Sequence, residues 1–390
     1  MKIRATVGAV SVGAMLALGC GDSDEDGSGA PAPLIAFASY NVALGVGFSE
    51  NPEARQAVIA RDLPALEADV VCLQEVWQPS DVEALTAAAV DQFPNAYYSV
   101  TPSDEIGVGC TQEEADLLGG CLEDNCAGLP EDEVALCVVV NCVDEFTTVS
   151  SDCQGCIAAN QSADPSLLAE LCAPGGAGVE RFDNQNGLLL LSRIALEDTD
   201  LLTLDSSLGD RGVLFARIQQ DGWPSAALFC THLAATQVSV PYTGDYGDWE
   251  GERHAQLERM LEYVEETRAE DEPAILMGDM NCGPETAEAL PASPDTFALF
   301  TDAGYEAPYV EDPGDCTWCS SNPMTGGADD DVEFDVILDH VLLSEVPGDL
   351  PRSARRVYDD PVEIEVDGQA VETYRSDHFG VLVTLSEPED

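Results

Sequence analysis

The chain has 390 residues, 45% of them hydrophobic, which is enough for one large or two ordinary globular domains. It carries 74 acidic and 15 basic residues, a formal net charge of −59, and its only lysine is Lys2. Because nucleic-acid binders depend on Lys and Arg contacts with phosphates, this balance argues mildly against a nucleic-acid partner, although adaptation to a saline habitat would produce the same acidity.

The N-terminal segment is typical of an export signal. Lys2 and Arg4 precede an apolar run that is too short to span a bilayer comfortably, which predicts a signal peptide over residues 1–19. The run ends in Leu-Ala-Leu-Gly-Cys at Cys20, which resembles the lipobox of bacterial lipoproteins and implies a lipid on that Cys. We therefore expect an exported protein, lipid-anchored in the periplasm or outer membrane or at the cell surface; cleavage that leaves the Cys free is the alternative. Residues 20–33 are acidic and rich in Gly, Ser, Ala and Pro, which predicts a disordered tether.

Apolar runs and helical spacing then predict alternating strands and helices up to about residue 100. Helices are expected over 52–67, where Pro64 ends or kinks the helix, and over 81–90, with Ser80 or Asp81 as the N-cap. The expected strands are 34–41, which ends at Asn41, and 69–74, which delivers Glu75.

The alternation stops between residues 101 and 180, a stretch with eight Cys and no Lys or Arg. The pairs 110 and 121, 126 and 137, and 142 and 153 recur every sixteen residues. Cys eleven positions apart on a helix would share a face but lie about 16 Å apart, too far to bond to each other. In an exported chain, 14 Cys favour disulfides over metal binding. We therefore predict an insert over 105–180 of two or three short helices linked by disulfides, either structural or a recognition cap, and the sequence does not choose the pairing.

Strand character resumes after Asn186. The organising strand is the apolar run that begins at Ala274 and delivers Asp279 and Asn281, two positions apart, so that both side chains can face one cleft. Residues 283–334 are expected to be mostly loop. The other expected elements are strands over 187–191, 195–204, 212–218, 226–231, 336–343 and 380–385, and a helix over 250–267.

Polar side chains stand at the ends of these apolar strands, where a buried sheet meets a cleft. Three of the four His in the chain occur in this position. Single examples are usually structural, but the combination indicates a catalytic cluster. Its members are Asn41, Glu75, His232, Asp279, Asn281, Asp339, His340, Asp377 and His378.

The order of these motifs resembles the endonuclease/exonuclease/phosphatase family over residues 34–386, interrupted by the Cys-rich insert. Within that family the chain is most similar to the secreted bacterial sphingomyelinases. A secondary likeness to deoxyribonuclease I, a Cys after Gly-Asp-x-Asn, implies that Cys282 pairs with Cys316 or Cys319. The family motifs are Asn41, Leu73-Gln74-Glu75, Thr231-His232, Gly278-Asp279-Met280-Asn281, Asp339 and Ser376-Asp377-His378, and the sphingomyelinase-like ones include Asn186-Gly187, Leu191-Ser192-Arg193, Asp210-Arg211-Gly212-Val213, Arg253, Gln256, Thr317-Trp318 and Asn322-Pro323.

The resemblance implies an α/β fold, a four-layer sandwich with two mixed β-sheets face to face and helices outside, in one catalytic domain over 34–386. It implies a Mg²⁺-dependent phosphoric diester hydrolase, with Mn²⁺ or Ca²⁺ as other possible ions. Hard carboxylate oxygens suit Mg²⁺, and phosphodiester hydrolysis needs a cation, an activated water and relief of charge on the leaving oxygen. The implied roles are metal binding by Glu75, with Asn41 and Asp377 nearby; water orientation by Asp279; a phosphate contact from Asn281; and acid or base roles for His232 and for His378, which Asp339 orients.

The sequence is compatible with two substrate classes, a phospholipid and a nucleic acid, and it indicates no protein partner. A deoxyribonuclease I-like endonuclease is the second function, and a non-catalytic binding protein on the same fold is the third. Trp223 and Tyr242 are the only candidates for an exposed membrane contact. We expect His340 to face away from the cleft, His254 to lie on a helix surface, and residues 329–331, three consecutive Asp, to form a solvated loop rather than a Ca²⁺ site.

Overall fold

The computed structural model describes residues 33–45, 49–98, 109–129, 137, 140–160, 165–176, 186–220, 223–237, 240–325 and 334–387. The expected signal peptide, the tether up to residue 32 with Cys20, and the Asp triplet at 329–331 lie outside these residues. Within the described residues, no helix has the length and apolar character needed to cross a membrane.

Two mixed β-sheets form the centre of the fold. The first has six strands in the order β10-β13-β1-β2-β4-β3, the second has five in the order β5-β6-β7-β8-β9, and β11 and β12 form a separate hairpin. The strands are β1 Pro33–Asn41, β2 Val70–Gln74, β3 Asn95–Tyr98, β4 Leu189–Ser192, β5 Glu197–Leu204, β6 Arg211–Gln220, β7 Trp223–His232, β8 Ala274–Asp279, β9 Asp339–Ser344, β10 Arg352–Val357, β11 Val362–Val366, β12 Gln369–Thr373 and β13 Gly380–Ser386.

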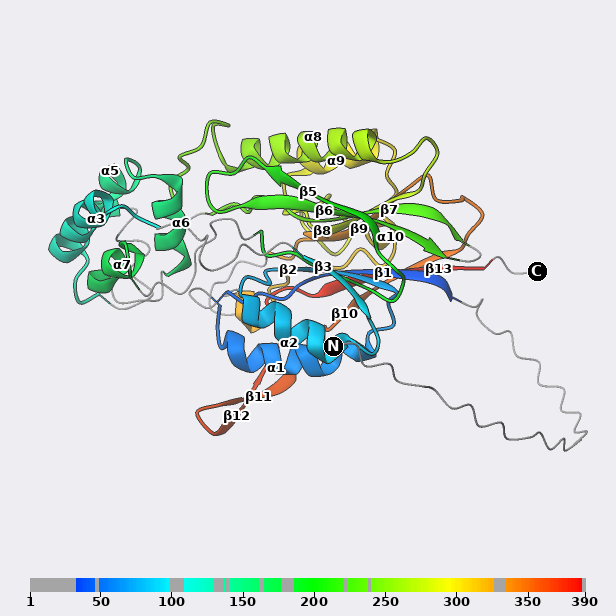
Figure 1. The fold of residues 1–390 in the computed structure, drawn as a ribbon, viewed down its shortest axis with the longest axis horizontal. Coiled ribbons are helices and arrows are strands. Elements are labelled where there is room, and N and C mark those ends of the chain that lie inside the picture. The colour runs from blue at the N-terminus through cyan, green and yellow to red at the C-terminus, as the bar shows by residue number, and fades with distance from the viewer. Residues whose placement is uncertain are drawn as a thin grey trace, which may run out of the picture. The chain divides into compact units, whose positions relative to one another are not determined.

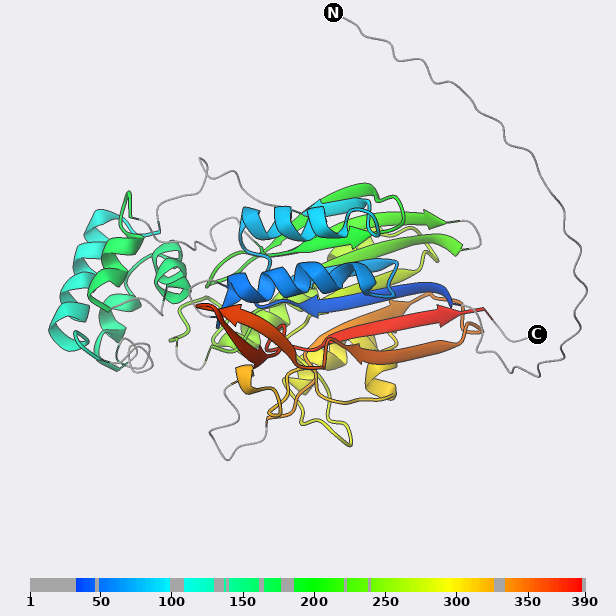
Figure 2. The same cartoon turned by 90° about the horizontal axis from the view of Figure 1, so that it is seen from below.

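The sheets pack face to face, with helices on their outer faces (Figures 1 and 2). Alternate residues of β1 show why: Ile35 and Phe37 enter the core between the sheets, whereas Ala36 and Ala38 pack under α1 and α2. On the second sheet, α8 and α9 cover the other outer face. The predicted four-layer sandwich is therefore confirmed. The helices outside the insert are α1 Pro52–Asp62, α2 Pro79–Ala89, α8 Trp249–Thr267, α9 Pro294–Asp302 and α10 Pro308–Glu311.

Some local predictions were wrong. The N-cap of α2 is Gln78, and Asp81 is instead the third helical residue, whose carboxylate accepts a hydrogen bond from the Gln78 backbone. Residues 283–334 are mostly loop in the part that the structure describes, as expected, but they also contain α9 and α10, which were not predicted. Strands β3, β10, β11 and β12 were not predicted, because each carries polar side chains on at least one face and lies at a sheet edge or in the separate hairpin.

The Cys-rich insert contains four described helices, α3 Gln112–Asn125, α5 Val143–Phe146, α6 Ser151–Ala159 and α7 Pro165–Cys172, where two or three were expected. Its eight Cys are joined as 110–153, 121–142, 126–137 and 156–172. The expectation that Cys eleven residues apart cannot bond is wrong for Cys126 and Cys137. Helix α3 ends at Asn125, before Cys126, so the two Cys do not share one helix face as the spacing argument assumed.

A disulfide also joins the two sheets, which the sequence did not reveal. Cys72 of β2 and Cys230 of β7 are fully buried and bonded across the central core, and they are 158 positions apart in sequence. Strand β2 leads into Glu75 and β7 ends at His232, so this crosslink holds the two halves of the candidate cluster together.

We expect disulfide mapping of the protein produced under oxidising conditions to recover the four insert pairs and the pairs 72–230 and 316–319. The insert has a small core and a strongly negative net charge, so it needs crosslinks for stability. Cys282 is the internal control, because it is buried and unpaired and should react with an alkylating agent only after denaturation. Eight free thiols in the insert, or stoichiometric zinc, would contradict the prediction.

Candidate active site

The sheet topology brings the predicted polar residues to one edge. β1 and β2 run parallel in the first sheet, and β7 and β8 run parallel in the second, so their carboxyl ends meet at the same edge of each sheet. The antiparallel strands β9 and β13 begin there. In the ladder of the second sheet, His232 pairs with Asp279, and Asp279 with Asp339, which makes the three residues neighbours.

Asp279 lies at the centre of the cluster and is almost fully buried. Its Oδ2 accepts a hydrogen bond of 3.0 Å from the Asn41 amide, and its Oδ1 accepts one of 2.9 Å from the backbone of Asn281. The Nε2 atoms of His232 and His378 lie 3.5 and 3.8 Å from Oδ2. Burial raises the pKa of Asp279 to about 7, with His378 acting to lower it and Asp339 to raise it. Asp279 can therefore exchange a proton near neutral pH.

His378 is held by Asp339, whose Oδ2 lies 2.8 Å from Nδ1 of the ring. Burial alone would lower the pKa of His378, but the carboxylates of Asp339 and Asp279 outweigh it and raise that pKa well above its usual value. The ring is therefore an imidazolium, with Nδ1–H donated to Asp339 and Nε2–H directed at the cluster.

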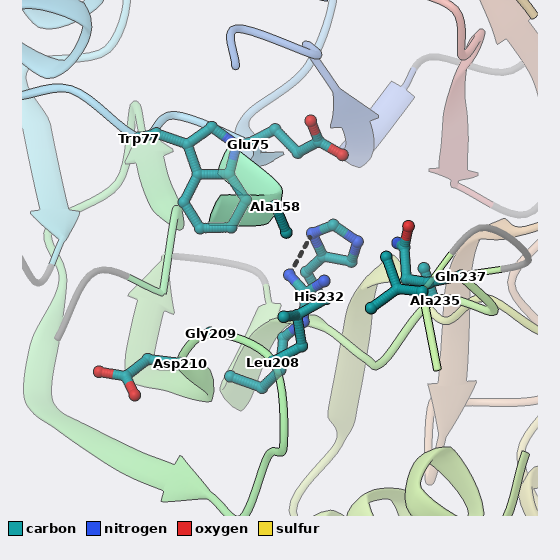
Figure 3. Close-up of a pocket in the computed structure, with 11 residues that line it drawn as sticks. Glu75, Trp77, Ala158, Leu208, Gly209, Asp210, His232, Ala235 and Gln237 are labelled. Carbon is teal, nitrogen blue, oxygen red and sulfur yellow. Dashed lines mark hydrogen bonds between the residues drawn. The ribbon is translucent and has the colours of Figure 1, made fainter. Parts of the chain in front are cut away.

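His232 has the opposite electrostatic surroundings. Nη1 of Arg211 lies 3.1 Å from its Nδ1, shown by the dashed line in Figure 3. A guanidinium can only donate, so Nδ1 accepts and the ring proton sits on Nε2. Burial, Arg211 and His378 together lower the pKa of His232 well below its usual value, so the ring is neutral. Arg211 was noted in the sequence only as part of Asp210-Arg211-Gly212-Val213, and its place beside a candidate catalytic His was missed.

Glu75 follows β2 in a left-handed backbone conformation, with φ 59°, and reaches the same edge from the first sheet. Its Oε1 accepts a hydrogen bond of 3.0 Å from the Asn41 amide. Burial and the negative charge of Asp377 raise the pKa of Glu75, so two carboxylates repel each other here. A hard divalent cation would relieve that repulsion, and these oxygen donors are the kind that Mg²⁺ prefers. The residues therefore fit a magnesium ion.

A second set of possible ligands is Asp279, Asp339 and His378, whose donor atoms lie within 4.8 Å of one another. In this set Nδ1 of His378 is already bonded to Asp339, and a protonated ring has no lone pair for a metal. Oδ1 of Asp339 is buried and has no hydrogen-bond partner among the described atoms. The set suits a proton network better than a metal.

The cluster opens into a cleft of about 710 Å³, lined by Glu75, Asn281, Asp377 and His378 among others. Asn281 donates its side-chain amide to the backbone oxygen of Leu233. His340 lies outside the cluster: it is buried, packs against Phe297 of α9 and contacts the backbone oxygen of Cys282. His254 lies on α8 with a half-exposed side chain.

The implied pairing of Cys282 is wrong. Cys282 is buried and free, and Cys316 and Cys319 are bonded to each other. The two residues enclosed by that disulfide support the catalytic pair. The Thr317 hydroxyl accepts hydrogen bonds from the backbone N–H groups of Leu338 and Asp339, and the Trp318 backbone pairs with that of His378.

We expect Thr317→Val to lower kcat about tenfold or more with little change in KM, because two backbone N–H groups beside Asp339 would lose their acceptor, at about 1–3 kcal/mol each. Steady-state kinetics and a melting curve check this. Thr317→Ser keeps the hydroxyl and should restore the rate. Unchanged kcat in a folded Thr317→Val protein would show that this contact does not position Asp339.

Comparison with known structures supports the fold. The chain is similar to sphingomyelinase C from Streptomyces griseocarneus, at 15% identity and a TM-score of 0.54 over 90% of this chain and 99% of that one. It is also similar to beta toxin from Staphylococcus aureus with bound magnesium ions (12% identity, TM-score 0.54, 90% and 99% covered). A third similar structure is truncated TDP2 from Caenorhabditis elegans (14% identity, TM-score 0.51, 90% and 98% covered). At these identities the likeness shows the fold alone.

Comparison with curated protein sequences gives no match. The sequence profile of the Endonuclease/Exonuclease/phosphatase family, in contrast, matches residues 38–378. That range begins within β1 and ends at His378, and it includes every residue of the cluster described above. The chain therefore belongs to the endonuclease/exonuclease/phosphatase family.

Proposed function

We propose that the protein is an exported, divalent-metal-dependent phosphodiester hydrolase of the sphingomyelinase-like type. The observation that carries the proposal is the position of Asn41, whose amide nitrogen lies 3.0 Å from Glu75 and 3.0 Å from Asp279. A carboxylate suited to a cation and a carboxylate suited to proton transfer are thereby held side by side. A single phosphate can reach both.

In this proposal Glu75 is the principal residue that would hold Mg²⁺, with Asn41 and Asp377 close to it. The ion, when bound, would neutralise charge on the phosphoryl oxygens. Asp279 orients the attacking water and accepts its proton, for which a pKa near neutrality is well matched. Asn281 holds a phosphate oxygen at the mouth of the cleft.

The two His act as different donors. His378 is charged and presents Nε2–H, so it stabilises the negative charge that develops on phosphorus-bound oxygens. His232 is neutral and presents Nε2–H, so it supplies a hydrogen bond to the phosphate or to the leaving oxygen. Asp339 keeps His378 in its orientation.

A phospholipid is the preferred substrate class. One similar structure is named a sphingomyelinase, and the six disulfides suit an oxidising, extracytoplasmic compartment. Of the two candidates for membrane contact, Trp223 is wrong because it is buried, and Tyr242 is half-buried and packs against Trp249. Hairpin β11–β12 has no aromatic residue and carries exposed Glu side chains, so it does not suit insertion into lipid. Membrane contact would then depend on the lipid expected at Cys20.

The test is a turnover panel with sphingomyelin, phosphatidylcholine, phosphatidylinositol phosphates and plasmid DNA, each with Mg²⁺ and with EDTA. Turnover of a phospholipid that EDTA abolishes supports the proposal. Nicking of plasmid DNA alone would favour the endonuclease, which the TDP2-like fold also allows. A folded protein with no turnover of any phosphodiester would favour a binding protein.

A further inference from the structure

A second, smaller cavity lies beside the cluster and is shown in Figure 3. Its volume is about 110 Å³, and it shares Glu75, Ala235 and Gln237 with the large cleft. The two cavities therefore meet where the scissile phosphate would lie. A phosphodiester carries two ester substituents, and the two cavities offer each substituent a separate space.

The small cavity admits only a compact group. Pockets for drug-sized molecules measure about 300–1,000 Å³, a range that includes the large cleft but not this cavity. Its wall includes Ala158 of α6, so the Cys-rich insert limits its depth. That helix is tied to the catalytic domain by a hydrogen bond of 2.7 Å from the Thr243 hydroxyl to Gln154.

The positive charge of the small cavity comes from Arg211, while Glu75 and Asp210 also line it. Its guanidinium lies over the ring of Trp77, 5.9 Å from the centroid, so the aromatic face that could receive a quaternary ammonium is already occupied by a cation. Among the described residues, no carboxylate lies within 4.0 Å of this guanidinium. Asp210 also lines the cavity, but its carboxylate points away from His232 in Figure 3.

The nearest compensating charges act at longer range and include Glu75 and Asp279. In the proposed function Glu75 holds a divalent cation, and its charge is then no longer available to Arg211. An anionic group in the small cavity would balance the guanidinium, whereas a cationic group would be repelled.

We propose that the small cavity is the head-group site of the substrate and that it takes a compact anionic head group bearing a carboxylate or a phosphate, not a quaternary ammonium. This inference rests on the proposed function and specifies its substrate class. In this proposal Arg211 selects the head group, and the Cys-rich insert limits the size of the head group.

The experiment measures binding of phosphomonoester products to the full exported chain by calorimetry in Mg²⁺. The probes are phosphoglycolate, glycerol 3-phosphate and phosphocholine, which carry an anionic, a neutral and a cationic head group on the same phosphate. We expect phosphoglycolate to bind at least tenfold more tightly than phosphocholine, with glycerol 3-phosphate between them. Arg211→Gln should abolish this difference and Arg211→Lys should keep most of it. Equal binding by the wild type, or a preference for phosphocholine, would overturn the inference.

A separate variant tests the limit that the small cavity sets on the size of the head group. Ala158→Phe fills the cavity and should weaken all three organic probes about tenfold or more while leaving inorganic phosphate unchanged. Ala127→Phe is the matched control, since Ala127 lies on the insert surface away from the cavity.

The outcomes separate this inference from the proposed function. If the head-group preference is found but no phosphodiester is hydrolysed, the proposed function is rejected and the head-group site is retained. Efficient hydrolysis of sphingomyelin with a preference for phosphocholine would reject the site and leave the function intact.

Discussion

Glu75→Gln should lower turnover on any phosphodiester by on the order of 10³, because a metal ion contributes several kcal/mol of transition-state stabilisation and each 1.36 kcal/mol is about tenfold. Gln keeps the size and one oxygen of Glu75 but loses the charge that anchors a hydrated Mg²⁺. The variant should therefore also bind Mg²⁺ or Mn²⁺ more weakly, which calorimetry measures independently of turnover.

The raised pKa of Glu75 adds a pH dependence to the same experiment. A cation binds the ionised carboxylate, so metal affinity in the wild type should fall as pH falls through that raised pKa. This decline should begin at a higher pH than an ordinary Glu would give. It should be absent in Glu75→Gln.

Two further variants test whether the loss of turnover and of metal binding is specific to Glu75. Glu50 lies on the rim of the same cleft and is exposed, so Glu50→Gln should be near neutral in both rate and metal affinity. Asp339→Asn tests the other possible ligand set. If Asp339→Asn weakens Mg²⁺ binding more than Glu75→Gln does, the ion belongs with Asp279 and His378. Full activity of Glu75→Gln in EDTA would remove the metal from the mechanism.

Much of the cluster was predictable because its residues follow from sheet geometry. Asn41, Glu75, His232 and Asp279 each end or follow an apolar strand, and parallel strands bring such ends to a common edge. The pairing of His378 with Asp339 was available only from the family resemblance. The two residues are 39 positions apart, and no local pattern indicates that they touch.

Other features depend on side-chain contacts that no spacing encodes. Arg211 occupies the first position of β6, and only the register with β7 places it against Nδ1 of His232. The pairing of Cys282 was inferred from a likeness to another enzyme, but the two Cys of Cys316-Thr317-Trp318-Cys319 lie close enough to bond to each other. The insert pairs likewise depend on where each short helix ends.

The second large effect concerns the two His of the cluster. We expect His232→Ala and His378→Ala each to lower the rate by on the order of 10²–10⁴, the usual contribution of one positioned proton donor or acceptor. Nε2 of both rings lies near Oδ2 of Asp279, at 3.5 and 3.8 Å, and in the proposed function both act on the same phosphate. The double variant should lose less than the product of the single losses, since groups that act as a unit are not additive.

The rate losses at His232 and His378 should also differ in how far a conservative substitution restores the rate. His232 is neutral and serves as a hydrogen-bond donor, so His232→Gln, which keeps a side-chain N–H, should recover part of the rate. His378 is charged through Asp339, so His378→Gln should recover little, and Asp339→Asn should resemble His378→Ala. His254→Ala is the control and should be near neutral, because this half-exposed ring on α8 lies outside the cluster and its polar contacts are with Thr296 and Glu258. Rates on a generic phosphodiester at saturating Mg²⁺ make the comparison. If His254→Ala is as damaging as His232→Ala, the site lies elsewhere.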